Sequence, residues 1–328
     1  MENLGQQGTS TTPFTPLPSA VVITNDEGEL ATRERVHEKR DSLKRCRDEA
    51  ASEARQRKSL PGFGGNRSFE EVVFYNQKID ELEDLLSATY LPQHSPQQLI
   101  SPRVFFVSPL FRVASRAAER SREIEITLAD DGNGRTTTYS GPELRQEEGL
   151  VFMALINMVR DLKVGTTASF SPSELCVALF GRYDGPTRKR LKDYIRRLQR
   201  GVIVTHEFSV QLCLRFEYPQ KGAWSVVLDK DIVRLFANTH IWLDLNTRRE
   251  LPDGLATWLY AYIESQTTLI PTSIETIRQL CGADASGCER AFANTLRRAL
   301  EHLKKHEVIE PGFRFKDGKV HWKKCSGS

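Results

Sequence analysis

The chain has 328 residues, of which 39% are hydrophobic and 27% are charged, and its formal net charge is +3. This length predicts two domains and a tail, and the modest hydrophobic content predicts that part of the chain lies outside a packed core. The longest apolar run, 150–159, is about half as long as a membrane-spanning helix, and the N-terminus does not resemble an export signal. Six cysteines without close pairing are typical of reduced thiols, so we expect a cytoplasmic protein with no membrane partner.

The N-terminal region is poor in large apolar side chains. Residues 1–30 are rich in Thr, Pro, Gly and Gln and cannot bury enough surface to become ordered. Residues 31–58 carry dense mixed charge without an aliphatic stripe, which favours a solvated, frayed helix over its alternative, a nonspecific contact with DNA. After a Pro-Gly break at 61–65, apolar spacing predicts a helix over 72–86, which either packs on the neighbouring domain or docks a partner protein. We therefore treat 1–102 as a largely disordered, partly helical region.

The next segment has the pattern of a compact unit. Alternation over 123–128 predicts a strand followed by a turn at 131–134, and 147–160 is apolar nearly all round, which predicts a buried helix. Residues 171–174 read as a capping box with proline at the first helical position, and Gly181 ends that short helix.

A second helix and a β-wing complete this unit. The sequence predicts a longer helix over 187–200. The β-branched and aromatic run 202–216 predicts a strand that pairs with 224–228 across the loop 219–222. Two strands and a loop directly after such a helix are typical of a wing.

The same pattern recurs at a constant offset. Thr166-Thr167, Leu179 and Gly181 align with Thr267-Thr268, Leu280 and Gly282. The second copy is predicted to contain the following elements: an apolar helix at 255–264, a capping box at 272–275, a long helix at 288–305, and a hairpin of 313–315 with 320–322 around an Asp-Gly turn.

These patterns predict an α+β protein with two tandem winged-helix (helix-turn-helix plus β-wing) domains and a largely disordered N-terminal tail. We place the domains at 103–228 and 229–328, after the region 1–102. One chain with two recognition helices can read an asymmetric DNA site without dimerising.

The first long helix has one apolar and one basic face. Its apolar face carries Leu191, Tyr194, Ile195 and Leu198, and Asp193 is the acid among many basic residues. Such a face gains affinity for DNA by releasing counterions, and arginine can also bond guanine O6 and N7. A solvated amphipathic helix is the alternative. The candidate DNA-binding residues are Arg188, Lys189, Arg190, Lys192, Arg196, Arg197 and Arg200.

The second long helix and the wings supply further candidates. Asn294 is a candidate adenine reader, since its amide can bond N6 and N7 together. Glu289 and Glu301 dilute the basic character of this helix. The wing lysines and arginines are expected beside phosphates, or else serve solubility. The candidates are Arg290, Asn294, Arg297, Arg298 and Lys305 on the helix, and Arg314, Lys316 and Lys319 on the wing.

Other site chemistries are disfavoured. The series Cys281, Cys288, His302, His306 resembles a zinc finger, but its first spacing is too long. The phosphate-binding loop Gly-x4-Gly-Lys-Ser/Thr is missing, and so is the His-x-His pair of a rolling-circle nuclease. We therefore expect no metal, no cofactor and no enzymatic activity.

Four segments in the same order resemble the TrfA-type replication initiators of broad-host-range plasmids. They are Thr138–Arg145 (TYSGPELR), Ser173–Cys176 (SELC), Val227–Ala237 (VLDKDIVRLFA) and Glu275–Gly282 (ETIRQLCG), within a resemblance that runs from about Ser108 to Lys324. The resemblance implies binding to directly repeated double-stranded origin sequences (iterons), melting of an adjacent AT-rich segment, and contact with its single strands. It also implies recruitment of the host initiator, the replicative helicase and the sliding clamp, and exchange between inactive dimers and active monomers.

The N-terminal region departs from that family. A clamp-binding motif is expected before the first domain, but here Gln98-Leu99-Ile100 runs into Ser101-Pro102. The alternatives to an initiator are a transcriptional repressor with the same fold and a nicking relaxase. A third possibility is that the tail carries regulation through partner contacts.

Overall fold

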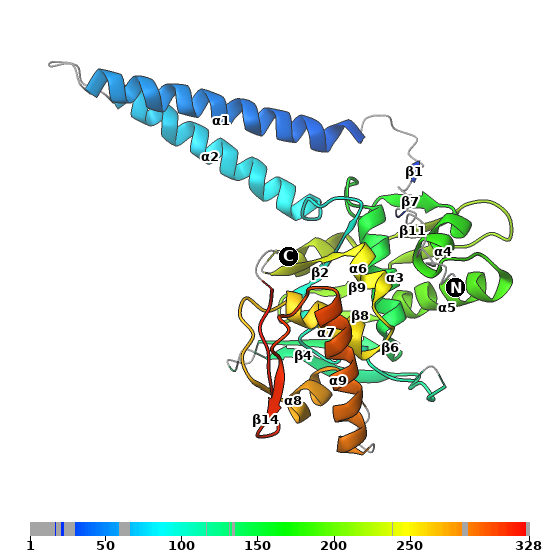
Figure 1. The fold of residues 1–328 in the computed structure, drawn as a ribbon. Helices are drawn as coiled ribbons and strands as arrows, with labels where there is room; N and C mark the ends of the chain where they lie inside the picture. The colour runs from blue at the N-terminus through cyan, green and yellow to red at the C-terminus, as the bar shows by residue number, and fades with distance from the viewer. Residues whose placement is uncertain are drawn as a thin grey trace, which may run out of the picture.

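Two long helices form an arm that projects from a mixed α/β body (Figure 1). The computed structural model describes residues 17, 21–22, 30–58, 66–115, 117–130, 132, 135–237, 239–283 and 288–325. In this part of the chain, none of the helices is long and apolar enough to cross a membrane.

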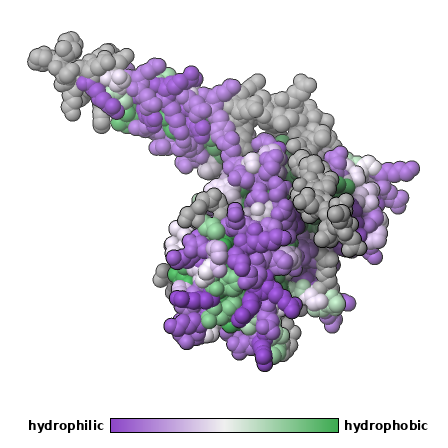
Figure 2. All heavy atoms as spheres, viewed as in Figure 1, coloured by the Kyte–Doolittle hydropathy of each residue, from purple (hydrophilic) through white to green (hydrophobic). Residues whose placement is uncertain are grey.

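The arm consists of α1 (Leu30–Lys58) and α2 (Asn66–Thr89), which lie side by side (Figure 1). The expected helix over 72–86 is confirmed within α2, and it packs on α1, with Ile79 buried. Lys44 of α1 pairs with Glu83 of α2 at 2.8 Å. Hydrophilic residues cover most of the visible face of the arm (Figure 2), so its solvated character agrees with its composition.

Part of the expected disordered tail is ordered on the body. β1 (Val21–Val22) pairs with Ser169 and Ala168 of β7 (Thr167–Phe170), and Leu17 is buried. The prediction of disorder for 1–30 is therefore wrong for these residues, because strand pairing satisfies their backbone and the core covers Leu17. The rest of 1–29 lies outside the described residues.

One antiparallel sheet combines two strands that precede the first repeat unit with two strands from within that unit. Its order is β4 (Ile124–Asp130), β5 (Thr136–Gly141), β8 (Val202–Val204) and β9 (Ser209–Gln211). The strand expected over 123–128 is confirmed. In the turn that follows, Gly132 has a φ of 74°, and the other residues of 131–134 lie outside the described part.

The helices of the first unit begin and end largely as their sequences indicate. Every residue of α3 (Gln146–Met158) is buried, as the apolar run predicts. The Ser171 side chain accepts a hydrogen bond from the Glu174 N–H at the start of α4 (Pro172–Phe180), and Gly181 ends α4 with a φ of 70°. α5 (Gly185–Arg200) begins two residues earlier than predicted because the Asp184 carboxylate caps it, accepting from the Thr187 N–H at 2.6 Å.

The run 202–216 does not form the single strand that we expected. Thr205 breaks it, because its hydroxyl accepts hydrogen bonds from the N–H groups of Glu207 and Phe208. β8 and β9 therefore join the sheet of β4 and β5. Of the three strands that the run forms, β10 (Arg215–Glu217) is the one that pairs with β11 (Trp224–Val227). β11 also pairs with β7.

The second unit starts with α7 (Leu255–Glu264), as predicted. The cap of α8 (Ile274–Leu280) is Ser273 instead of the expected Thr272, although both lie in β13 (Thr272–Ser273). The Ser273 hydroxyl accepts from the Thr276 N–H, whereas the Thr272 hydroxyl donates to the Ile270 carbonyl oxygen. The elements that follow are α9 (Glu289–Lys305), β14 (Arg314–Lys316) and β15 (Lys319–His321).

The hairpin turn of the second unit is also confirmed. Asp317 and Gly318 have φ values of 52° and 70°, the pair of positive angles that an Asp-Gly hairpin turn needs.

Both units share one order of elements. A buried helix, a short strand, a short helix, a long helix and a hairpin follow one another, and the second hairpin strand pairs with the short strand. The first unit differs by the insertion of β8 and β9 between its long helix and its hairpin.

A segment ahead of the first unit connects the two units. β2 (Gln98–Pro102), which we assigned to the N-terminal region, pairs over its whole length with β12 (His240–Asp244), which precedes α6 (Leu245–Glu250). β3 (Phe111–Arg112) pairs in parallel with β6 (Leu144–Arg145). Between them lies the short helix η1 (Arg103–Phe105), and a second one, η2 (Lys230–Phe236), follows β11. One buried hydrophobic cluster includes residues of both units.

Candidate nucleic-acid interface

The two faces of α5 are separated as predicted. Leu191, Tyr194, Ile195 and Leu198 are buried against the first unit. Of the cations, Lys189, Arg196 and Arg200 are exposed, and Arg188, Arg190, Lys192 and Arg197 are half-buried. The cationic side chains therefore lie over a fixed apolar base, which determines the direction in which they leave the helix.

The hairpin of the first unit contacts three of these cations. Arg188 donates to the carbonyl oxygens of Pro219 and Gln220 at 3.2 and 3.0 Å, which holds the wing loop against α5. The Lys192 ammonium lies 3.9 Å from the ring centroid of Tyr218. Arg196 donates to the Tyr218 hydroxyl at 2.7 Å, with its guanidinium carbon 5.0 Å from the ring centroid. Cation–π contacts of this kind restrict the guanidinium without removing its remaining donors.

The second unit repeats one of these contacts. The guanidinium carbon of Arg297 lies 4.9 Å from the ring centroid of Phe315 in β14. Arg196 and Arg297 occupy equivalent positions of the repeat, and in both units an aromatic residue of the wing supports the arginine. The other candidates on α9, namely Arg290, Asn294, Arg298 and Lys305, are exposed.

Arg197 differs from its counterpart Arg298. It donates to the Glu148 carboxylate at 2.7 Å, and Glu148 is fully buried at the start of α3. Burial raises the pKa of Glu148, and the nearby Arg120 and Arg197 oppose that shift. The structure thus commits the Arg197 guanidinium to an ion pair within the unit, while Arg298 is exposed on α9. Arg190 also has an internal partner, the Thr187 hydroxyl at 3.3 Å.

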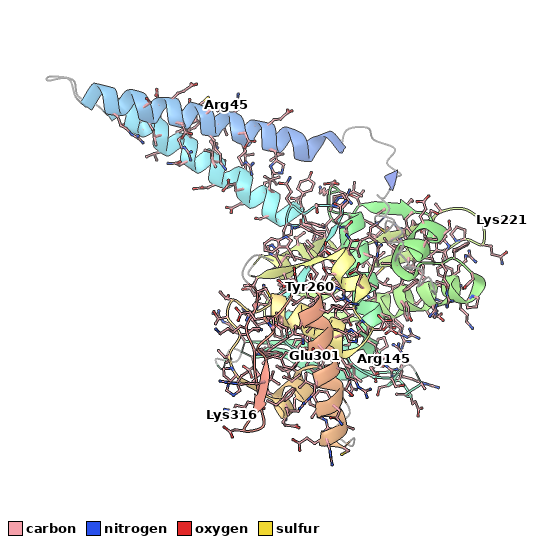
Figure 3. All side chains as sticks on the ribbon, in the orientation of Figure 1. Arg45, Arg145, Lys221, Tyr260, Glu301 and Lys316 are labelled. Carbon is pink, nitrogen blue, oxygen red and sulfur yellow. The ribbon has the colours of Figure 1, made fainter. Side chains whose placement is uncertain are left out.

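The wing cations lie at the edges of the body. Lys221 extends from the loop between β10 and β11, and Lys316 lies at the tip of the second hairpin (Figure 3). Arg314 and Lys319 are exposed on the same hairpin. The fold therefore carries the wing candidates on the hairpins that also position Arg196 and Arg297.

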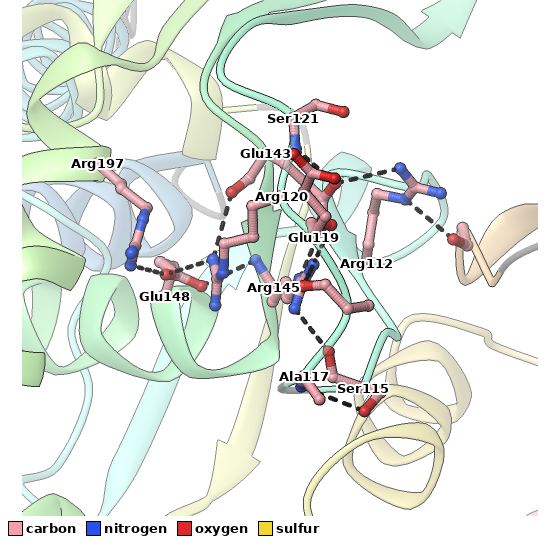
Figure 4. A network of polar contacts seen from close by, with 12 residues as sticks. Arg112, Ser115, Ala117, Glu119, Arg120, Ser121, Glu143, Arg145, Glu148 and Arg197 are labelled. Atoms are coloured by element: carbon pink, nitrogen blue, oxygen red, sulfur yellow. Dashed lines mark hydrogen bonds and ion pairs between the residues drawn. The ribbon is translucent and has the colours of Figure 1, made fainter.

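A buried polar network lies around the start of α3 (Figure 4). Arg145, 2% exposed, donates to the Glu143 carboxylate at 2.7 Å and to the carbonyl oxygens of Ser115, Ala118 and Glu119. Burial by itself would raise the pKa of Glu143, but hydrogen bonds from Arg145 and the Ser121 N–H, with the charges of Arg145 and Arg112, lower that pKa overall.

Four residues that contact the candidate cations or their network were not predicted from the sequence, namely Tyr218, Phe315, Glu148 and Arg112. The aromatic residues carry a usable signal, because each lies in a predicted wing strand or loop among polar residues. Glu148 and Arg112 carry none, since their partners are distant in the sequence.

Two other expectations can be compared with the structure. Among the described residues, no three His, Cys, Asp or Glu side chains gather as a metal site, and Cys281 is buried while Cys288 is exposed. Leu99 and Ile100 are fully buried in β2, so the apolar residues of the segment considered for clamp binding are not accessible in this fold, while Gln98 is exposed.

Residues 77–324 match the family described as TrfA protein. The chain belongs to this family. The resemblance found in the sequence is thereby confirmed. A relative from Escherichia coli, the plasmid replication initiator protein TrfA, is 26% identical over 198 residues, which are 57% of this chain and 51% of the relative. The chain thus spans about half the length of that relative.

Two solved structures of domains 2 and 3 of RctB are weakly similar to the fold. Their TM-scores are 0.45 and 0.41, with sequence identities of 14% and 12%. The similarity covers 70% and 65% of this chain and 99% and 95% of those chains. At these scores the similarity carries no argument about the fold or function of this protein.

Proposed function

We propose that this protein is a plasmid replication initiator that binds directly repeated origin sequences (iterons) through two winged-helix domains. Membership in the TrfA protein family supports the initiator role. The observation that carries the DNA-binding part is the repeated arrangement in which an arginine of each long helix, Arg196 or Arg297, rests on an aromatic residue of its own wing.

In this proposal each long helix enters a major groove of double-stranded origin DNA. The two grooves lie about one helical turn, roughly 10 bp, apart. Arg196 and Arg297 read base edges, because stacking on Tyr218 and Phe315 reduces the freedom that each guanidinium would lose on binding. The exposed wing cations contact phosphates, which sets affinity and orientation.

The proposal extends to the events that follow binding. The protein opens an adjacent AT-rich segment and contacts its single strands, then recruits the host initiator, the replicative helicase and the sliding clamp, and exchanges between dimer and monomer. Clamp binding through Gln98–Pro102 is not included, since the apolar residues of that strand are buried. We further propose that the protein needs no metal or cofactor and is not an enzyme.

An assay of origin opening distinguishes an initiator from the two alternatives, a transcriptional repressor and a nicking relaxase. The full-length protein would be added to a supercoiled plasmid that carries its cognate origin, and unpaired thymines would be mapped with permanganate. We expect reactive thymines in the AT-rich segment with the wild type and few with Arg297→Ala. Sequence-specific binding without reactive thymines would instead indicate a repressor. A nicked origin with a covalent tyrosine adduct would indicate a relaxase.

A further inference from the structure

Polar contacts join the two units at their interface, which we call the seam, and two of them involve the turn before α9. Arg112 of β3 donates from Nε to the Gly282 carbonyl oxygen at 2.9 Å, at the turn that separates α8 from α9. The neighbouring Val113 N–H donates to the Cys281 carbonyl oxygen at 2.8 Å. These two bonds attach the turn before α9 to a strand that pairs with β6 of the first unit.

From Arg112 a continuous polar chain leads to α5 (Figure 4). Arg112 pairs with Glu143 at 3.5 Å, and Glu143 pairs with the buried Arg145 at 2.7 Å. The backbone N–H of Arg145 donates to the Glu148 carboxylate at 2.9 Å. The same carboxylate accepts from the Arg197 guanidinium of α5 at 2.7 Å. The turn before α9 and the last turn of α5 are therefore joined by a chain of bonded, mostly buried residues, in which the backbone N–H of Arg145 supplies one link.

Further contacts across the seam oppose rotation of one unit against the other. Arg249 of α6 donates to the Ala178 carbonyl oxygen in α4, and Thr257 of α7 donates to the Gln146 side chain of α3 at 3.4 Å. The two units also share one hydrophobic cluster. Two domains with such an interface move as one body, unlike domains that are joined only by a linker.

We infer that Arg112 and Gly282 are positioning residues that fix the separation and rotation of α5 and α9, so that the protein accepts its two DNA half-sites at a single spacing. This inference rests on the proposed function. One inserted base pair moves the second half-site by about 3.4 Å and turns it by about 35°. A rigid pair of reading helices cannot follow that change, whereas helices on independent domains can.

Gly282 provides a matched test. Gly181 caps the C-terminus of α4, and Gly282 follows Cys281, the C-cap of α8. Both glycines have a positive φ, 70° and 63°, so an alanine brings the same kind of backbone strain to both. A Cβ at Gly181 meets nothing within 4 Å, but a Cβ at Gly282 would lie 2.8 Å from Cγ and 3.1 Å from Nε of Arg112. Gly282→Ala therefore displaces the Arg112 contact, and Gly181→Ala controls for strain alone.

The experiment measures binding of the full-length chain to labelled duplexes that carry the two half-sites at the native spacing or with one or two base pairs inserted or removed. Each single half-site duplex is measured as well. For the wild type and Gly181→Ala, we expect about a tenfold or greater loss of affinity on a one-base-pair change. The ratio of the affinity at native spacing to the affinity at altered spacing should fall at least about threefold in Arg112→Ala and Gly282→Ala. Arg112→Lys should restore part of this ratio.

Arg234→Ala is the control for loss of an ion-paired arginine, since Arg234 pairs with Glu207 at 3.0 Å. It should keep the wild-type spacing profile. A wild type that binds the half-sites but tolerates altered spacing would overturn the inference and leave the proposed function intact. An unchanged profile in both Arg112→Ala and Gly282→Ala would overturn it as well. No specific binding to any duplex by the wild type would refute the proposed function itself.

Discussion

Arg197 and Arg298 occupy equivalent positions in the two units, yet their surroundings differ, since Arg197 pairs with Glu148 and Arg298 is exposed. Replacement of Arg197 by alanine removes one of two arginines that bond the fully buried Glu148. A hydrogen bond to a charged group contributes about 1.5–3 kcal/mol. Glu148 keeps Arg120 at 2.8 Å and the Arg145 N–H at 2.9 Å, and the Arg197 side chain is itself 29% exposed. We therefore expect Arg197→Ala to lower the free energy of unfolding by about 1.5 kcal/mol, at the low end of that range.

The assay compares Arg197→Ala with Arg298→Ala in urea. With a denaturant slope of about 3 kcal/mol/M, the Arg197 variant should shift its unfolding midpoint by about 0.5 M. Arg298 is exposed, so its variant should stay within about 0.5 kcal/mol of the wild type. In binding to the selected DNA site the order should reverse, with a loss of about 1–3 kcal/mol for Arg298→Ala if it reads a base. Equal unfolding midpoints, or equal losses of DNA affinity in the fully folded variants, would refute this reasoning.

Three further perturbations test other contacts. Tyr218→Phe keeps the ring but removes the hydroxyl that accepts from Arg196, so affinity for the selected duplex should fall about two- to fivefold by fluorescence anisotropy, while the thermal midpoint stays the same. Gly149→Ala places a Cβ 2.9 Å from the Phe111 ring and should cost about 1–3 kcal/mol in urea unfolding, whereas Gly185→Ala, with nothing within 4 Å, should be nearly neutral; similar midpoints would contradict the packing argument. Glu143→Gln should destabilise the protein by about 2 kcal/mol at pH 7. Because the pKa of Glu143 is lowered on folding, its contribution is complete above the unfolded pKa of about 4.3 and is lost as the pH falls through the folded value, so the difference from wild type should shrink below about pH 4; a difference that grows there would contradict the assignment.

Much of the local structure follows from the sequence because short-range chemistry determines it. The Ser171 cap, the Gly181 stop and the Asp317-Gly318 turn each depend on neighbours within four residues. The apolar faces of α5 and α9 follow from helical periodicity in the same way.

The structural features that the sequence did not indicate depend on contacts between residues that are far apart in the chain. Nothing near Gln98–Pro102 indicates that the segment pairs with His240–Asp244. The ion pair of Arg197 requires Glu148, which packs there only in the folded unit. The strand break at Thr205 carried a local signal, a threonine that can form a turn, which the strong β propensity of its neighbours obscured.

The central claim, that one chain reads DNA with two separate helices, is tested most directly by selecting duplexes from a random library with the full-length protein at near-physiological salt. The account predicts a single long asymmetric site, in which Arg196→Ala relaxes sequence preference in one half and Arg297→Ala relaxes it in the other. Enrichment of only one short half-site, unaffected by one of the two variants, would contradict the two-helix account. No enriched sequence at all would show that the basic faces do not specify DNA sequence.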